Sequence, residues 1–183
     1  MENESLRGQL LIASPTMLDP NFFRTVILVL NHDHDGALGV VLNRPGEIET
    51  SDPLPSWSLI SVPPAVVFTG GPVSPESGIG IAKCTKAAER HGFAPVFGNL
   101  GTVDLTQSPD DLDVEMVRVF SGYAGWTSGQ LEMEIADGAW FSVPALSEDA
   151  FSRDPDLLWR QVLKRQAPEL AMFAHCPPNP SMN

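Results

Sequence analysis

The sequence has few cysteines and no long apolar run. Its two cysteines, Cys84 and Cys176, stand far apart and outside any CxxC or Cys/His ligand pattern, which excludes a disulfide framework and indicates no zinc site. No apolar run reaches the roughly 20 residues of a membrane-spanning helix. The opening stretch, MENESLRGQ, lacks the apolar core of a signal peptide. We therefore expect a cytoplasmic protein without membrane association.

Basic residues are also scarce. The chain has 11 lysines and arginines against 23 aspartates and glutamates, for a net charge of -12 and an isoelectric point near 4.5. Because an acidic surface repels phosphate backbones, direct nucleic-acid binding is not expected. The densest basic cluster, Arg160, Lys164 and Arg165, fits a solvated face better than a nucleic-acid groove.

The remaining composition is that of a folded protein. The 183 residues are 43% hydrophobic and 19% charged, with no repeat and no low-complexity segment, which is typical of one domain with a sizeable core. We predict a single domain over residues 1–183, with a core at about 8–146, a C-terminal helix at 155–167 and an irregular tail at 174–183.

Strand patterns dominate the chain. Short apolar runs predict strands at residues 8–13, 25–30, 37–43, 65–69, 78–83, 93–97, 102–105, 117–120 and 139–143. The second run, TVILVL, is typical of a strand buried on both faces, and Asp35-Gly36 marks a hairpin after it. Residues 45–64 are interpreted as a long, mobile surface connection with a helical turn around 57–60. The predicted fold is α+β, a compact domain whose mostly antiparallel or mixed sheet is flanked by helices.

One helix is predicted near the C-terminus. Asp154 can cap it, Pro155 suits its first position and Pro168 ends or kinks it. Between them, Leu158 and Leu163 belong to an apolar stripe with helical spacing.

A second helix is predicted within GYAGWTSGQLEMEI, residues 122–135, which follows a strand. One interpretation is an anion site at the start of this helix, where backbone amides and the helix dipole attract negative charge. Thr127 marks that start. Tyr123 is the distinctive residue of the motif for which no structural task is evident.

We favour a structural interpretation of the same motif. Thr127 and Gln130 have the spacing of a capping box, and Trp126 and Leu131 occupy the staple positions. This predicts that Thr127 caps a helix running over residues 128–135, with Trp126 packed on Leu131. Glycines complete this interpretation, two at a sharp turn (positions 122 and 125) and one at the helix end (position 138).

His32 and His34 fall in HDHD, directly before the predicted hairpin turn. In an extended segment both would point the same way and could share a metal ion. A metal site needs further ligands, however, and none is evident, so we favour a polar hairpin and predict no metal site.

Asn43 and Arg44 end an otherwise apolar strand. Arg44 fits either an ion pair with Asp19 or Asp33, or an anion clamp, since a guanidinium binds carboxylate or phosphate through two parallel hydrogen bonds. We favour the ion pair and interpret Arg24 in the same way.

Gly70 and Gly71, in GGPV, suit either a tight turn or a ligand loop with open backbone amides. Walker, dinucleotide and GxSxG patterns are absent from the sequence, and Cys84 has no histidine near it in sequence. The sequence therefore predicts no catalytic residue and no cofactor.

Taken together, these motifs resemble the YqgE/AlgH family of small bacterial proteins. The resemblance rests on GQLLIASP (8–15), DPNFFRTV (19–26), NHDHDGALGVVLNRP (31–45), GGPV (70–73) and GYAGWTSGQLE (122–132). It implies one compact domain with a bent or bifurcated sheet flanked by helices, and no agreed activity. One branch of the family carries the label of transcriptional regulator, but no helix-turn-helix signature is visible in this sequence.

We expect a non-enzymatic regulatory or interaction protein with a protein partner. The alternative is a small-anion or nucleotide-binding domain whose pocket gathers Arg44, the GGPV turn and the helix start. Its candidate ligand residues are Asn43, Arg44, Gly70, Gly71, Tyr123 and Thr127. A hydrolase ranks third. The sequence does not indicate an oligomeric state.

Overall fold

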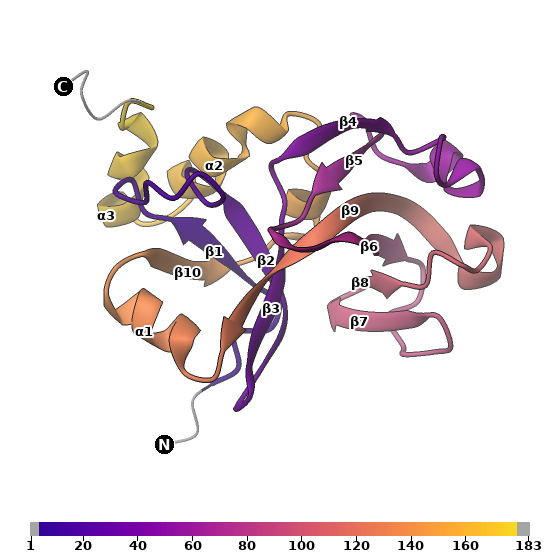
Figure 1. Cartoon of the computed structure of the whole chain (residues 1–183), viewed down its shortest axis with the longest axis horizontal. Coiled ribbons are helices and arrows are strands. Elements are labelled where there is room, and N and C mark those ends of the chain that lie inside the picture. Colours follow the sequence, from indigo (N-terminus) through magenta and orange to yellow (C-terminus); the bar gives the residue numbers. More distant parts are fainter. Residues whose placement is uncertain (1–3, 179–183) are drawn as a thin grey trace.

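Strand β9 (Val114–Thr127) organises the sheet of this protein. The structure is a computed structural model that describes residues 4–178 (Figure 1). Along one edge, β9 pairs antiparallel with β6 (Val73–Cys84). Its other edge is shared, because β3 (Gly36–Val41) pairs antiparallel with its end and β5 (Val66–Thr69) pairs parallel with its middle. The sheet therefore forks at β9.

The other strands extend the sheet on both sides of the fork. The order is β10-β1-β2-β3-β9-β6-β8-β7, and β4 pairs with β5 outside this path. The bounds are β1 Gln9–Ala13, β2 Val26–Asp33, β4 Pro45–Glu49, β7 Phe93–Phe97, β8 Leu100–Val103 and β10 Trp140–Pro144. The sheet is strongly curled (Figure 1). The mostly antiparallel sheet with a few helices is consistent with the predicted α+β fold, although the helices are minor components.

Helices cover both faces of the half of the sheet that contains β1 and β2. Alternate residues of each strand point to opposite faces. Leu10 and Leu28 join the buried cluster that contains residues of α2 (Pro155–Lys164). Leu11 and Ile27 join a second cluster, which contains Leu131 of α1 (Gln130–Ala136). The prediction that residues 25–30 form a strand buried on both faces is thus confirmed.

Helix α2 is the predicted C-terminal helix, with its apolar stripe fully buried. Trp159 anchors it, since its indole N–H donates a hydrogen bond of 2.9 Å to the carbonyl of Ala13 in β1. The helix ends at Lys164, three residues before the predicted bound of 167. Ala167 is extended, as the residue before a proline prefers, and a short helix α3 (Pro168–Ala171) follows.

The remaining helical segments are short 3₁₀ helices: η1 Pro55–Ile60, η2 Pro109–Leu112, η3 Ser147–Phe151 and η4 Met172–His175. Turn η4 includes the first two residues of the predicted irregular tail, and residues 179–183 of that tail lie outside the described residues. Among the helices of residues 4–178, none combines the length and apolarity that crossing a membrane requires.

The interpretation of residues 45–64 as a surface connection was incomplete. The predicted helical turn is present as η1, but strand β4 precedes it and pairs with β5. Trp57 of η1 is fully buried, and its indole N–H donates to the carbonyl of Leu105 at 3.2 Å. This segment, residues 45–69, forms an arm packed against the sheet, which we call the β4–β5 arm.

Arg118 of β9 fastens this arm to the sheet. Its side chain is only 2% exposed, and its guanidinium lies 4.4 Å from the ring centroid of Phe68. It donates hydrogen bonds to four backbone carbonyls, those of Val62, Pro63, Ala150 and Ser152. Burial lowers the pKa of Arg118 to about 10.

Candidate functional site

The tryptophan motif forms a strand end and not the predicted turn. β9 continues through its glycines to Thr127, which pairs with Gly36 of β3. The helix begins at Gln130 with Gly129 as N-cap, at φ 72°, and no side chain caps it. The prediction that Thr127 caps a helix over residues 128–135 was therefore wrong. Continued pairing with β3 holds Thr127 in the strand, and its N–H donates to the side chain of Gln130 instead.

Trp126 is fixed by a residue that the sequence did not single out. Its indole N–H donates to Glu134 Oε2 at 2.9 Å, and so does the indole of Trp140. The two indole rings meet edge to face, with centroids 6.1 Å apart. Trp126 and Leu131 share one buried cluster, as predicted. Gly138 ends the helix region with a φ of 78°, as its predicted position requires.

The predicted hairpin at HDHD is confirmed, because β2 ends at Asp33 and β3 begins at Gly36. Its two histidines have different surroundings. His34 has an 89% exposed side chain 3.3 Å from Asp35, whereas the side chain of His32 is 4% exposed. They therefore do not face a common position.

His32 joins three parts of the chain. Its Nδ1 accepts a hydrogen bond from the N–H of Leu6 at 2.9 Å, so the ring proton is on Nε2. Nε2 donates to Glu132 of α1 at 2.8 Å. The histidine thus ties the N-terminal segment to β2 and α1.

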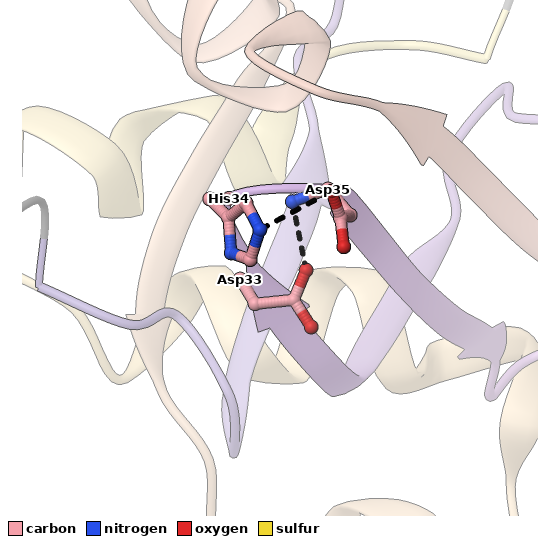
Figure 2. A group of neighbouring side chains, drawn as sticks. All are labelled: Asp33, His34 and Asp35. Atoms are coloured by element: carbon pink, nitrogen blue, oxygen red, sulfur yellow. Dashed lines mark hydrogen bonds and ion pairs between the residues drawn. The ribbon is translucent and has the colours of Figure 1, made fainter.

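Figure 2 shows the exposed group Asp33, His34 and Asp35 at the hairpin tip. Their potential ligand atoms lie within 4.8 Å of one another. A turn accounts for this grouping, because Asp33 Oδ1 accepts a hydrogen bond from the N–H of Asp35 at 2.9 Å. That bond and one from Asn31 lower the pKa of Asp33.

Arg44 and Arg24 do not form the ion pairs that we favoured from the sequence. Arg44 donates to the carbonyl of Phe23, and Arg24 donates to the carbonyl of Cys176. Asn43 is buried, and its side chain forms hydrogen bonds with the backbone. Its Oδ1 accepts from the N–H of Val26 at 3.0 Å, and its Nδ2 donates to the carbonyl of Arg24 at 2.8 Å.

A small cavity brings three arginines together. We call it the arginine pocket. It has a volume of about 160 Å³ and is lined by Phe23, Arg24, Asn43, Arg44, Asp156, Trp159 and Arg160. From the sequence, Arg160 is expected in a solvated cluster. In the structure it is half-buried and faces the two arginines near the strand ends. Its contribution could not be read from spacing, because more than a hundred residues separate it from Arg44.

The other predicted ligand residues do not reach this pocket. Gly70 lies at the fork of the sheet, where its N–H donates to Ser121 and its carbonyl accepts from Val41. At Gly71, a Cβ would come within 2.1 Å of the backbone of Tyr123, so the close approach of the β5–β6 connection to β9 requires glycine there. Tyr123 packs against the core, and Thr127 is paired with the opposite end of β3 from Arg44. The convergence that the anion-site alternative required is not found.

A larger concavity was not predicted. It measures about 670 Å³ and lies between the β4–β5 arm and strands β6 and β9. We call it the acidic groove. Its apolar surface comes from Leu54, Val67, Leu105, Val119 and Phe120, and Ile48 of β4 is 58% exposed at its lip. Two exposed carboxylates, those of Asp52 and Glu76, also line it.

Comparison with known proteins agrees with this architecture. The sequence pattern described as AlgH-like matches residues 10–171. A UPF0301 protein of Streptomyces avermitilis is 48% identical over the whole chain and 97% of its own length. One of Thermobifida fusca is 42% identical, again over the whole chain and over 98% of its own length.

Two solved structures are similar throughout. Protein DIP2367 from Corynebacterium diphtheriae superimposes with a TM-score of 0.89 at 29% identity, covering 96% of this chain and 95% of that one. The solution structure of the AlgH protein from Pseudomonas aeruginosa gives a TM-score of 0.71 at 28% identity, with 97% of each chain covered. This chain belongs to the AlgH-like (YqgE/AlgH) family.

Proposed function

We propose that this protein is a non-enzymatic interaction protein whose acidic groove binds a basic, amphipathic segment of a partner protein. The observation that carries the proposal is the groove itself. It combines an apolar floor, an exposed apolar lip and two carboxylates in one concavity of about 670 Å³.

The apolar part of the groove supplies the binding energy in this proposal. Ile48 is exposed between Glu47 and Glu49 of β4. It lines the groove together with the half-buried Val67 and Leu105. Covering such a surface is worth about 25 cal/mol for each Å² of apolar area removed from water. Concave apolar patches with a polar rim commonly mark interaction sites.

The charge selects the partner. Asp52 and Glu76 favour lysine or arginine beside the apolar side chain that enters the groove. The net charge of -12 further attracts cationic segments and disfavours anionic ones. A regulatory role in the cytoplasm would then proceed through protein binding. The same charge disfavours direct contact with DNA.

The proposal is tested by titrating the isotope-labelled full chain with short synthetic peptides that combine leucine or phenylalanine with lysine or arginine. We expect methyl signals of Ile48, Val67 and Val119 to shift. Matched peptides with glutamate in place of the basic residues should cause no shift. Equal binding of the acidic peptides, or no binding of any basic peptide, would refute the proposal.

A matched pair of variants locates the binding surface. Ile48→Ala should weaken peptide binding about fivefold or more, as loss of an exposed anchor commonly does. Leu59→Ala is the control, because Leu59 is 96% exposed on η1 and does not line the groove. If both substitutions weaken binding equally, the groove is not the site.

A further inference from the structure

The arginine pocket concentrates positive charge on an acidic protein. Three guanidinium groups and one carboxylate line it, although the chain has about half as many basic as acidic residues. This is the reverse of the acidic groove, and it calls for a separate explanation.

The three arginines are far from saturated with hydrogen bonds. A guanidinium carries five N–H donors, yet within residues 4–178 Arg24 and Arg44 each donate one hydrogen bond, to a backbone carbonyl. The guanidinium of Arg160 forms no hydrogen bond and no ion pair with any residue in that range. The pocket therefore offers several N–H donors from two loops and from helix α2.

Two of the arginines are held in place before any ligand arrives. Arg24 has a φ of 54°, an uncommon conformation for a non-glycine residue, and the buried Asn43 fixes it by donating to its carbonyl. Its guanidinium lies 4.5 Å from the ring centroid of Trp159, within the range of a cation–π interaction. Arg44 is held at the end of β3 by its bond to Phe23.

The positive charges of the pocket repel one another. Burial, and then repulsion from Arg160, lower the pKa of Arg24. Burial also lowers the pKa of Arg44, and Asp156 counteracts this effect. With one carboxylate against three guanidiniums, the pocket favours a ligand that brings about two negative charges.

We propose that Arg24, Arg44 and Arg160 bind a small tetrahedral oxyanion of the phosphate type, either free or as the terminal group of a small solute. A volume of 160 Å³ holds about five water molecules at about 30 Å³ each, which is enough for one phosphate group. Sites that enclose a larger organic ligand measure about 300 Å³ or more. The site is independent of the acidic groove, and binding there needs no catalysis.

Titration of the full chain with inorganic phosphate tests this site. The readout is the arginine side-chain NMR signals, with sodium chloride at matched ionic strength as the reference. We expect the signals of Arg24, Arg44 and Arg160 to shift with one common dissociation constant. A parallel titration with methyl phosphate distinguishes the sources, because tighter binding of the ester indicates a terminal phosphate group and tighter binding of phosphate indicates the free ion. No saturable shift with either compound would overturn the proposal.

Three single-charge variants sharpen the test. Arg160→Gln should weaken phosphate binding about tenfold, because it removes a charge-assisted donor from a residue on which no described contact depends. Lys164→Gln removes the same charge from a residue of α2 that does not line the pocket, and it should weaken binding clearly less than Arg160→Gln does. Asp156→Asn should tighten binding by about threefold, since it removes the carboxylate that competes with the anion. Equal affinities in Arg160→Gln and Lys164→Gln would show that general charge, and not this pocket, attracts phosphate.

Discussion

Trp126 and Glu134 face each other across the junction between β9 and α1, with the indole N–H 2.9 Å from Glu134 Oε2. The carboxylate also accepts the indole N–H of Trp140 and the side-chain amide of Gln130. Glu134 therefore connects strand β10 and the end of β9 to the helix that lies between them in the sequence.

Replacing Glu134 by alanine should destabilise the protein by about 2 kcal/mol, because two largely buried indole N–H groups lose a charged acceptor. Thr127→Ala should cost less than about 0.5 kcal/mol, since its hydroxyl caps no backbone group and surface changes of this kind are small. Urea unfolding of both variants measures the difference. Comparable losses for the two would mean that the junction depends on Thr127 after all.

His32→Leu should loosen the N-terminal segment, because the N–H of Leu6 loses its acceptor and Glu132 loses a hydrogen bond. We expect a cost of about 1–3 kcal/mol, typical of leaving a buried polar group unsatisfied, and faster hydrogen exchange at Leu6. His34→Leu is the control, because that side chain is 89% exposed. If the amide of Leu6 exchanges at the same rate in both variants, His32 does not hold the N-terminal segment in place.

Arg118→Met should be among the most damaging single substitutions, at about 3 kcal/mol or more, because four carbonyls lose their donors together. Arg118→Lys should lie between this variant and the wild type, since lysine keeps the charge but has three donors on a different geometry. Thermal unfolding gives the ranking. A methionine variant as stable as the wild type would show that these bonds contribute no net stability, as can happen when a buried charge is removed.

The thiols should differ in reactivity. Cys84 is fully buried, and burial raises the pKa of its thiol above the ordinary 9.0, whereas Cys176 is half-buried. A thiol reagent should modify Cys176 in the native protein and Cys84 only after unfolding. Simultaneous modification of both in the native state would contradict the burial of Cys84.

The raised pKa of Cys84 makes the stability of the protein depend on pH. Burial raises the pKa of the Cys84 thiol in the folded state. Its contribution to the free energy of unfolding is therefore fully present below pH 9.0, the ordinary value of the pKa, and decreases as the pH rises from 9.0 towards the pKa of the folded state. Cys84→Ala should remove this part of the decline in unfolding free energy. A decline of the same size in the variant would assign it to other groups.

Much of the fold followed from apolar runs and turn chemistry, because buried strands such as β1 and β2 consist mainly of apolar residues. Strand β9 did not, since its GYAG segment has the composition of a turn. The structure explains these glycines by contacts with a distant segment: a Cβ at Gly122 would lie 2.5 Å from the carbonyl oxygen of Gly71. Such a requirement is invisible in a single sequence, because it depends on which strands become neighbours.

The candidate sites were harder to predict than the fold for the same reason. Arg44 was recognised as a possible anion ligand, but the pocket also needs Trp159 and Arg160 of α2, which lie more than a hundred residues further along the chain. Glu134 was overlooked because a glutamate on a short helix looks like a solvated residue until two tryptophans are placed beside it.

The β4–β5 arm covers a strand edge as well as forming a wall of the acidic groove. Unpaired strand edges recruit other chains, and the arm covers the edge of β9 that β3 leaves open. β5 pairs with Phe120 and Ser121, and the N–H of Val62 donates to the carbonyl of Val117. A chain in which the arm detached would present a bare, apolar strand edge to its neighbours. The surface that we propose for partner binding is therefore built on a segment whose attachment also closes a strand edge.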